Sequence, residues 1–252
     1  LAALLASKRL PPALLFFGPA GVGKTLAAVE FAKALNCASP GPDSGPCGRC
    51  ASCAAADRGT DMDLKRVNAA AQAALLDEDE AKQRLIKIET IRHAVRDMEM
   101  RSFSGRWKTA VVEDAERLVP AAANALLKSL EEPPPRAVWI LLASRREELL
   151  PTVLSRCHAV RFRALDRGAL KTALERLGLP AAEAAALALV SEGSAGRALE
   201  IKERQVPDPG SWTDDALAPF ALADSLPREL HLARPLAEEH LRRMAWRLRG
   251  ED

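Results

Sequence analysis

Gly18-Pro19-Ala20-Gly21-Val22-Gly23-Lys24-Thr25 is the stretch that decides the fold of this 252-residue chain. Gly18 and Gly23 are separated by four residues and followed by Lys and Thr, which is the pattern of a phosphate-binding loop, or P-loop. The backbone N–H groups of such a loop surround phosphates, and the amino end of the following helix adds a favourable dipole. The lysine reaches the β- and γ-phosphates, and the threonine hydroxyl binds magnesium. The stretch predicts a nucleotide-binding fold with ATP or ADP and Mg²⁺ as cofactors.

The flanking sequence supplies the strand and the helix that this loop requires, which disfavours a chance glycine-rich turn. Ala13–Phe17 is a short apolar run that predicts a buried strand, and the apolar spacing over 24–35 predicts a helix. Further strands are predicted at 64–67, 109–112, 138–142 and 159–162, helices at 89–98 and 121–130, a loop at 37–60 and an exposed connection at 70–81. This alternation predicts an α/β fold with a parallel sheet covered on both faces.

After Arg163 the pattern changes to helices alone, at about 166–177, 181–190 and 194–203. A proline-rich linker at 206–210 and a helical tail follow. We therefore expect a nucleotide-binding domain at 1–162, a small helical domain at 163–206, and a further helical domain that begins at 207 and is truncated at Asp252. Because the first residue is Leu1 and not Met, we also expect the chain to be clipped at its start.

The composition excludes several classes of protein. Hydrophobic residues make up 48% and charged residues 28%, which is typical of a globular chain, and no apolar run is long enough to span a membrane. We find no signal peptide and expect a cytoplasmic protein. The net charge is only +2, so contact with DNA would come from a local patch or a larger assembly. Aromatic residues are 4%, with no Tyr, which disfavours a base-stacking platform.

Four of the five cysteines lie close together in the sequence: Cys37, Cys47, Cys50 and Cys53. Thiolates at such short spacings bind one tetrahedral Zn²⁺, and because all four ligands come from the protein, the site is structural and not catalytic. The alternative is four reduced thiols without a metal. Cys157 stands apart in an apolar stretch and is interpreted as a packing residue.

The pair Glu113-Asp114 follows the apolar run at 109–112. In P-loop proteins an acidic element at the end of such a strand holds magnesium and polarises the attacking water. Two solvated acids at a strand end are the structural alternative. The P-loop upstream favours the catalytic interpretation.

At this point the sequence resembles the bacterial clamp loader of DNA polymerase III, the AAA+ group that contains the gamma/tau and delta-prime subunits. The resemblance spans about residues 8–200 and is carried by the P-loop, the cysteine loop, Asn124-Ala-Leu-Leu-Lys128-Ser-Leu-Glu131-Glu132-Pro133-Pro134 and Leu154-Ser155-Arg156-Cys157. It implies an AAA+ domain with a zinc loop, a helical lid at 163–206 and the start of a helical collar. An ordinary amphipathic helix with a proline stop would explain the periodicity of the long string but not its residues.

The resemblance also implies roles for two residues and a set of partners. Arg156 would be a trans arginine that reaches the nucleotide of a neighbouring subunit, where it stabilises charge on the γ-phosphate. Ser144 lies near the family's first sensor position, after the third strand of the fold. The partners would be gamma/tau and delta subunits in a hetero-oligomeric ring, and the sliding clamp and primer-template DNA through the assembly.

Three departures from the gamma/tau pattern favour delta-prime. Gly196 occupies the position of the arginine that senses the γ-phosphate, and Arg197 lies one place further, about 100° around the helix. The acidic pair reads Glu-Asp where gamma/tau has Asp-Glu, and residues 143–150 look more like delta-prime. We expect weak ATP hydrolysis at most, with polymerase activity belonging to the holoenzyme. A gamma/tau-type motor, or another AAA+ ATPase such as a helicase loader, is the alternative; a small-molecule kinase leaves the cysteine loop unexplained.

Overall fold

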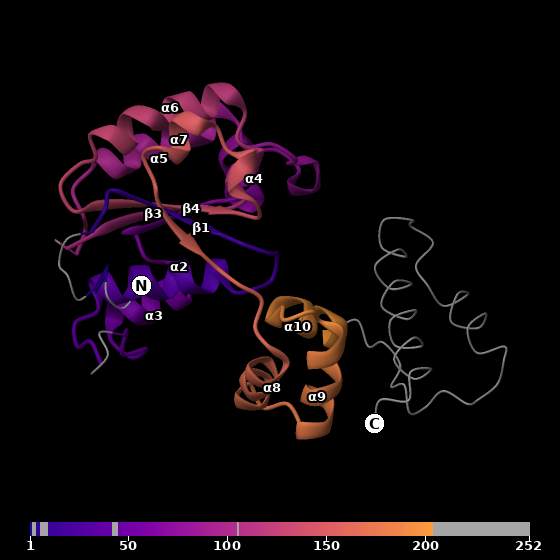
Figure 1. Ribbon diagram of the computed structural model, residues 1–252. Coiled ribbons are helices and arrows are strands. Elements are labelled where there is room, and N and C mark those ends of the chain that lie inside the picture. The colour runs from indigo at the N-terminus through magenta and orange to yellow at the C-terminus, as the bar shows by residue number, and fades with distance from the viewer. Residues whose placement is uncertain (2–3, 6–9, 42–44, 105, 204–252) are drawn as a thin grey trace. The chain divides into compact units, whose positions relative to one another are not determined.

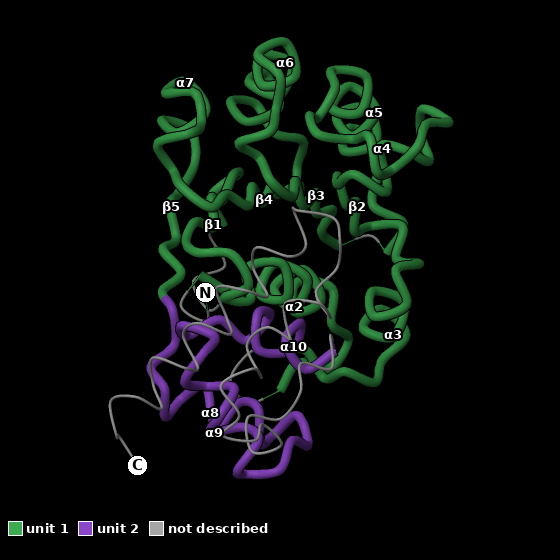
Figure 2. The backbone as a smooth tube through the Cα atoms, turned by 90° about the vertical axis from the view of Figure 1, so that its right-hand side faces the viewer, with its two compact units in different colours: residues 1–163 green, residues 164–252 purple. Residues whose placement is uncertain are grey.

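The computed structural model describes residues 1, 4–5, 10–41, 45–104 and 106–203. The chain divides into two compact units, residues 1–163 and residues 164–252, the second described over 164–203 (Figure 2). The predicted linker at 206–210 and the segment 207–252 lie outside the described residues. Within the described ranges, no helix is both long and apolar enough to cross a bilayer.

The first unit alternates strands with helices (Figure 1). Its elements in chain order are β1 (Ala13–Phe17), α2 (Lys24–Asn36), α3 (Ala51–Asp57), β2 (Leu64–Val67), α4 (Ala69–Leu76), the 3₁₀ turn η1 (Glu80–Lys82), α5 (Ile88–Glu99), β3 (Lys108–Val112), η2 (Ala115–Arg117), α6 (Pro120–Glu131), β4 (Ala137–Ala143), η3 (Arg146–Glu148), α7 (Pro151–Leu154) and β5 (His158–Arg161).

These strands form one sheet in the order β2-β3-β4-β1-β5, and every neighbouring pair is parallel. In Figure 2 the five strands lie in a row, with α4–α7 on one side and α2 and α3 on the other. The prediction of an α/β fold with a parallel sheet covered on both faces is confirmed. Because the strands are parallel, the segments that follow β1, β3 and β4 all leave the sheet at its carboxyl edge.

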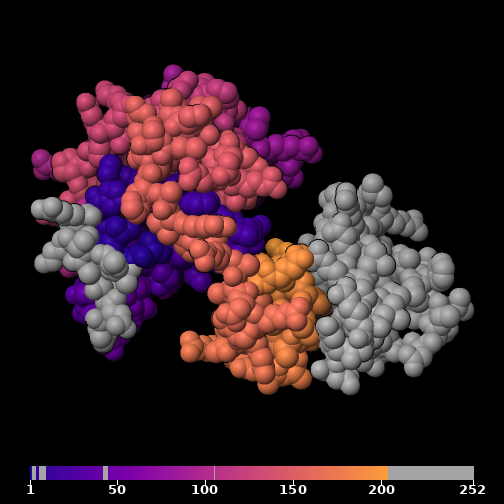
Figure 3. Space-filling model, in the orientation of Figure 1, coloured from indigo at the N-terminus to yellow at the C-terminus, as the bar shows by residue number. Residues whose placement is uncertain are grey.

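Alternate residues of each strand point to opposite sides of the sheet. The sheet is apolar on both faces because both sets of residues are apolar. Leu15 of β1 packs in the cluster that contains Leu126 of α6, whereas Leu14 and Phe16 pack in the cluster that contains Phe31 of α2. In the space-filling view, atoms of the α6 and α7 segment form part of the upper surface of the first unit (Figure 3). The sheet therefore packs between two apolar clusters, one on each face, and this packing fixes the position of its carboxyl edge.

The prediction for 70–81 as an exposed connection is wrong over its first half. Ala69–Leu76 forms α4, which begins with the Asn68 side chain accepting a hydrogen bond from the Ala71 amide. Gln72 is buried and makes four side-chain hydrogen bonds: its amide group donates to Gln83 Oε1 and to the Leu85 carbonyl, and its oxygen accepts from the Lys87 amide and the Thr90 hydroxyl. An alanine-rich helix has no polar face and leaves no periodic signal.

Two further helices were absent from the sequence prediction. Ala51–Asp57 forms α3 inside the stretch interpreted as a loop, and Pro151–Leu154 forms the single turn α7. Both are short, and α7 begins with a proline, which suits the first position of a helix. The predicted strands agree with the structure, although the last one runs over His158–Arg161 and begins one residue earlier than expected.

The second unit is a small helical bundle over its described residues. It consists of α8 (Arg167–Arg176), α9 (Ala181–Val190) and α10 (Ala195–Glu203). The helices share one apolar core that contains Leu170, Leu174, Ala184, Leu187, Ala198 and Ile201. The Asp166 side chain caps α8 by accepting a hydrogen bond from the Ala169 amide. The helices predicted after Arg163 are present.

We predict that Gln72→Ala destabilises the first unit by about 3 kcal/mol, because it leaves the half-buried Lys87 amide and the buried Thr90 hydroxyl without an acceptor. Urea denaturation measures the loss. Glu80→Ala, at an exposed position on the neighbouring turn η1, is the control and is expected to unfold like the wild type. Equal stability of the Gln72 variant and the control would contradict this account of α4.

Candidate functional site

The P-loop leaves the sheet directly after β1, and α2 begins at Lys24. The Gly18 amide donates a hydrogen bond to the Ala143 carbonyl at 3.2 Å, so the loop starts against the end of β4. A Cβ atom on Gly18 would lie 2.2 Å from the Phe162 carbonyl oxygen, and Gly23 has φ +91° immediately before the helix. Both positions therefore require glycine, the first for space and the second for its backbone conformation. The motif has the structural context that its sequence predicts.

Lys24 lies over the loop. Its Nζ donates to the carbonyl oxygens of Gly18 at 2.7 Å and Pro19 at 2.8 Å. Burial lowers the pKa of Lys24, and the negative charges of Glu116 and Asp114 oppose this by raising it. The lysine therefore lies close enough to two acidic residues at the carboxyl edge of the sheet to feel their charge.

The acidic pair predicted from the sequence separates in the structure. Glu113 Oε1 accepts three hydrogen bonds, from Arg66 Nε at 2.9 Å, Arg66 Nη2 at 2.6 Å and Asn68 Nδ2 at 3.0 Å. Asp114 has a left-handed backbone with φ 49° and forms an ion pair with Arg117 at 3.5 Å. Glu113 is therefore engaged at the end of β2, while the charge of Asp114 acts on Lys24.

Sequence reasoning missed three residues of this edge. Arg66 and Asn68 donate hydrogen bonds to Glu113. Asn68 also caps the amino end of α4, and an asparagine at that position was the sequence signal that could have located Asn68. Glu116 Oε1 accepts a hydrogen bond at 3.0 Å from the amide of Ser144, the predicted sensor residue. Its position three residues after Glu113 carries no motif that the sequence analysis could use.

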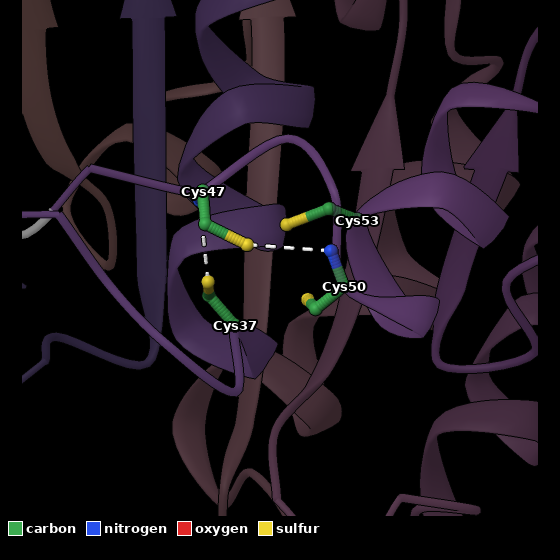
Figure 4. Close-up of side chains that lie close together, drawn as sticks. All are labelled: Cys37, Cys47, Cys50 and Cys53. Carbon is green, nitrogen blue, oxygen red and sulfur yellow. Dashed lines mark hydrogen bonds between the residues drawn. The ribbon is translucent and has the colours of Figure 1, made fainter.

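The four predicted cysteine ligands come together, although they span seventeen positions of the chain (Figure 4). The Sγ atoms of Cys37, Cys47, Cys50 and Cys53 all lie within 4.8 Å of one another. The Cys47 amide donates to Cys37 Sγ, and the Cys50 amide donates to Cys47 Sγ, each at 3.3 Å. Four sulfurs on one zinc ion, each about 2.3 Å from the metal, would be about 3.8 Å apart. The cluster is compatible with zinc after a small contraction.

The environment of the thiols suits a metal site. Backbone N–H groups of Ala38 and Cys53 lower the pKa of Cys50 to about 6, and those of Arg49 and Cys50 lower the pKa of Cys47. Burial raises the pKa of Cys53 to about 12, so this thiol needs a cation to become a thiolate. Backbone N–H groups thus favour the thiolate forms of Cys47 and Cys50, whereas the buried Cys53 would ionise next to a bound cation.

The cysteine cluster is anchored to the sheet by the segment before β3. Arg106 Nη1 donates to the Cys37 carbonyl at 2.6 Å and to the Asn36 carbonyl at 3.3 Å. The buried Asn36 side chain accepts from the Trp107 amide at 2.9 Å and donates to the Trp107 carbonyl at 2.8 Å. The end of α2, where the cysteine loop begins, is therefore fixed against the start of β3.

Arg156 lies at the opposite end of the sheet from the P-loop. It precedes β5, and His158 of that strand is level with Leu14 near the start of β1, whereas the P-loop follows the other end of β1. Arg156 Nε donates to Glu131 Oε1 at 2.6 Å, Nη2 of Arg156 also pairs with Glu131, and Nη1 donates to the Thr152 carbonyl at 2.8 Å. Within this unit, the arginine and the phosphate loop face different edges.

The remaining residues singled out from the sequence are placed as follows. Cys157 is half-buried and packs against the core on the α6 side, and burial raises its pKa to about 12. In the second unit Gly196 lies in the first turn of α10, and Arg197 Nη1 pairs with Glu192 at 3.0 Å. The structure leaves the predicted sensor role of position 196 untested.

A five-stranded parallel sheet with a P-loop after β1, acidic residues after β3 and a helical second unit defines an AAA+-like fold. The family model described as "DNA polymerase III, delta subunit" matches residues 1–166, and the chain belongs to this family. Two solved structures resemble this chain, and at their low sequence identity they support the fold and nothing further. One is a DNA polymerase III gamma subunit-related protein of Thermotoga maritima, with a TM-score of 0.52 and 21% identity. The superposition covers 91% of this chain and 72% of the Thermotoga chain. A mutant of RuvB from the same organism has TM-score 0.51 and 16% identity, covering 80% and 57%.

Curated relatives are the tau and gamma subunits of DNA polymerase III. The tau/gamma subunit of Haemophilus influenzae is 36% identical over 162 residues, which cover 64% of this chain and 22% of the relative. The gamma/tau subunit of Mycobacterium tuberculosis H37Rv is 33% identical over 179 residues, covering 70% and 28%. The chain therefore spans less than a third of the length of these two relatives.

We predict that Gly18→Ala destabilises the first unit by about 3 kcal/mol, because the new methyl group meets the Phe162 backbone, which cannot move without breaking the β1–β5 pairing. Gly45→Ala is the matched control, since a Cβ atom there meets nothing within 4 Å. Thermal unfolding compares the two variants with the wild type. A Gly18 variant as stable as the Gly45 variant would show that the close approach is absent.

Proposed function

We propose that this chain is a delta-prime-type subunit of a bacterial DNA polymerase III clamp loader. It acts in the cytoplasm, in a ring with gamma/tau and delta subunits, in the ATP-dependent loading of a sliding clamp on primed DNA. The observation that carries the proposal is the position of Arg156, at the sheet end away from its own P-loop, in a chain of this family. In this proposal, the arginine serves a nucleotide on another subunit.

The carboxyl edge of the sheet holds the nucleotide in this proposal. The amides of the P-loop and the amino end of α2 surround the phosphates, and Lys24 exchanges its two loop carbonyls for β- and γ-phosphate oxygens. Thr25, with the acidic residues Glu113 and Asp114, would hold Mg²⁺, which neutralises phosphate charge when it is bound. Binding needs mainly this cradle.

Hydrolysis needs groups that act only in the transition state, and the chain supplies few of them. Glu113 is held by Arg66 and Asn68, and Arg197 is paired with Glu192 inside the second unit. Gly196, at the expected sensor position, has no side chain to offer. We therefore propose that the isolated subunit binds ATP but hydrolyses it poorly.

The test of this site is ATP binding and turnover by the isolated chain. We expect ATP to bind, Lys24→Ala to weaken binding by about tenfold or more, and turnover to stay below about 1 s⁻¹. Lys82→Ala, which removes an exposed lysine on η1, is expected to bind like the wild type. Turnover at ordinary enzyme rates would favour the gamma/tau alternative described below.

Zinc in the cysteine cluster would be structural. Four protein thiolates would fill its coordination sphere and leave no open position for a substrate. The metal would supply cross-links between the end of α2, the loop after it and the start of α3, and binding would stabilise the fold through linkage. Because Arg106 joins Cys37 to the segment before β3, the stabilisation would extend to the sheet.

We expect elemental analysis of the purified chain to find about one zinc ion per molecule. Cys53→Ser removes the most buried ligand and is expected to abolish stoichiometric zinc and to lower the melting temperature. Cys157→Ser, outside the cluster, should retain the metal. Four titratable thiols and no zinc in the folded wild type would exclude a structural zinc site.

Arg156 would stabilise charge on the γ-phosphate of a neighbouring subunit. A trans arginine contributes about 10³–10⁵ in turnover in GTPases, and several sites in a ring would share and dilute the effect. We expect Arg156→Ala to preserve zinc content, assembly and this chain's own ATP binding, while it lowers the clamp- and DNA-stimulated ATPase rate of the reconstituted loader. Arg156→Lys rescues only in part, because lysine lacks the planar fork.

The control for this experiment is Arg92→Ala, which removes an exposed arginine of α5 and should leave the loader's ATPase rate unchanged. If Arg156→Ala assembles normally and the loader runs at the wild-type rate, Arg156 is a surface charge. Its ion pair with Glu131 would then be its whole role.

A gamma/tau-type motor subunit is the second candidate. The observation that favours it is the intact Lys24 and Thr25 of the P-loop together with 36% identity to a tau/gamma subunit. The two candidates differ in the turnover of the isolated chain, which the motor would show and the delta-prime-type subunit would not. Another AAA+ ATPase, such as a helicase loader, would also turn over ATP but would not support clamp loading.

A further inference from the structure

A groove of about 540 Å³ lies along the open edge of β2, and none of the residues proposed for the phosphate, zinc or trans-arginine sites lines it. β2 is the last strand of the sheet and pairs with β3 alone, at the end of the row of strands in Figure 2. Leu26 of α2, on one face of the sheet, and Asp97 of α5, on the other face, both line the groove. Leu64 and Arg66 of β2 line it as well. The groove therefore crosses the free edge of the strand instead of lying over one face.

Every second residue of β2 directs its backbone groups at β3. The Asp63 carbonyl accepts a hydrogen bond from the Thr109 amide, and the Val67 carbonyl accepts one from the Glu113 amide. In a parallel ladder, alternate residues of a strand bond to the neighbour on one side and the residues between them point to the other side. The positions between these therefore direct their N–H and C=O groups away from the sheet, toward the groove.

Leu64 and Arg66 are these outward-facing positions. The Leu64 amide donates to the Asp61 carbonyl at 3.3 Å, but the Leu64 carbonyl and both backbone groups of Arg66 have no hydrogen-bond partner among the described residues. An acceptor, a donor and a second acceptor thus follow one another along the edge. One further strand would pair with all three groups.

A second copy of this chain is a poor match for that edge. β2 has only four residues, and two of them, Lys65 and Arg66, are positively charged. If two β2 strands paired edge to edge, these charges would lie close together across the new ladder, which is destabilising. The edge therefore suits a strand of different sequence.

Apolar side chains border the groove and remain accessible to solvent. Leu26 is 66% exposed and Met62, in the connection from α3 to β2, is 70% exposed. Both line the groove, so a strand added to β2 would cover them. Burial of this apolar surface would add to the free energy of backbone pairing.

The groove also carries an excess of negative charge from α2, α3 and the connection after α3. Glu30 and Asp57 line it, and the buried ammonium group of Lys33 pairs with both, at 2.6 Å and 2.8 Å. One cation thus serves two carboxylates. Asp61 accepts a hydrogen bond from the Asp63 amide at 2.9 Å and has no ion pair among the described residues. Three carboxylates against one cation favour a partner with basic side chains.

The remaining charges of the groove do not cancel this excess. Asp97 pairs with Lys108 at 3.5 Å, and Arg66 is already engaged in the ion pair described above. Lys65 points to the face that α5 covers, because Val67, two residues further along the strand, packs in the core cluster of that face. The acidic excess and the exposed apolar groups are therefore left for the side chains of an added strand.

We propose that the open edge of β2 is a docking site for an extended segment of a partner protein. The segment adds a sixth strand to the sheet and carries both apolar and basic side chains on the face toward α2 and α3. Backbone hydrogen bonds of Leu64 and Arg66 hold it, while Leu26, Met62 and Asp61 select its side chains. This surface goes beyond the proposed function and does not depend on ATP binding.

The experiment adds a synthetic peptide to the ¹⁵N-labelled full chain and follows amide hydrogen exchange by NMR. The probe is acetyl-Val-Thr-Lys-Thr-Val-Thr-Lys-amide, which in an extended conformation carries valine and lysine on one face and threonine on the other. Exchange of the Arg66 amide should slow by about tenfold or more at saturating peptide, because this N–H would donate to the added strand. The amides of Lys65 and Val67 already face β3 and should change less.

Two altered peptides separate backbone pairing from charge. The same sequence with N-methyl groups on alternate residues keeps its side chains but loses donors, and we expect it to bind about fivefold or more weakly. Replacing both lysines of the peptide by glutamate should weaken binding by a similar factor.

Met62→Lys tests the groove from the side of the protein. It replaces an exposed apolar group by a positive charge, so we expect the lysine peptide to bind about fivefold or more weakly. Leu177→Lys is the matched control, since Leu177 is 62% exposed, does not line the groove and should leave peptide binding unchanged. Melting temperature confirms that both variants are folded.

Protection of the Arg66 amide by the lysine peptide, reduced by N-methylation and by Met62→Lys, supports the docking site. An Arg66 amide that exchanges at the same rate with about 1 mM peptide overturns it. Equal binding of the glutamate peptide, or of the N-methylated one, also overturns it. If the Arg66 amide becomes protected without peptide as the concentration of the chain rises, a second copy covers the edge and the proposed partner is wrong.

Discussion

The parallel alignment of five strands is the constraint on which the rest of this structure depends. Parallel pairing places the carboxyl ends of β1, β3 and β4 at one edge, so the P-loop, the segment 113–116 and Ser144 meet although they are distant in sequence. The apolar cores on both faces fix the strands, and Gly18 allows the loop to start within reach of Phe162. The proposed phosphate site is thus a consequence of sheet topology, with few side-chain contacts needed to assemble it.

The same topology separates two chemical tasks. Arg156 precedes β5 at the amino end of the sheet, where Glu131 holds it, while Lys24 lies at the carboxyl end. One chain therefore presents the P-loop on one edge and an arginine on another, which is the arrangement that the proposed role between neighbouring subunits requires. The cysteine cluster has a third role: through Arg106 and Asn36 it fixes the start of β3 against the end of α2.

Much of the fold could be predicted because its signals are local. The P-loop has a fixed residue pattern, and the buried strands are continuous apolar runs. Four cysteines within a short segment predict their own cluster. The helix α4 was missed because an alanine-rich segment is apolar on every side, and its order depends on hydrogen bonds of Gln72 to residues eleven to eighteen positions away. The engagement of Glu113 by Arg66 and Asn68 depends on the pairing of β2 with β3. No local pattern encodes it, and the same holds for Glu116 and Ser144.

Hydrogen exchange of the full chain, with and without ATP and Mg²⁺, tests the central claim most directly, because it locates the ligand without a mutation. If the carboxyl edge of the sheet is the phosphate site, nucleotide slows exchange of the amides in 18–25, which would donate to phosphates, and in the neighbouring segments 113–116 and 144. The amides of the cysteine loop, which follows the other end of α2, should exchange at an unchanged rate. Protection confined to other segments, or no protection at saturating nucleotide, would contradict the account.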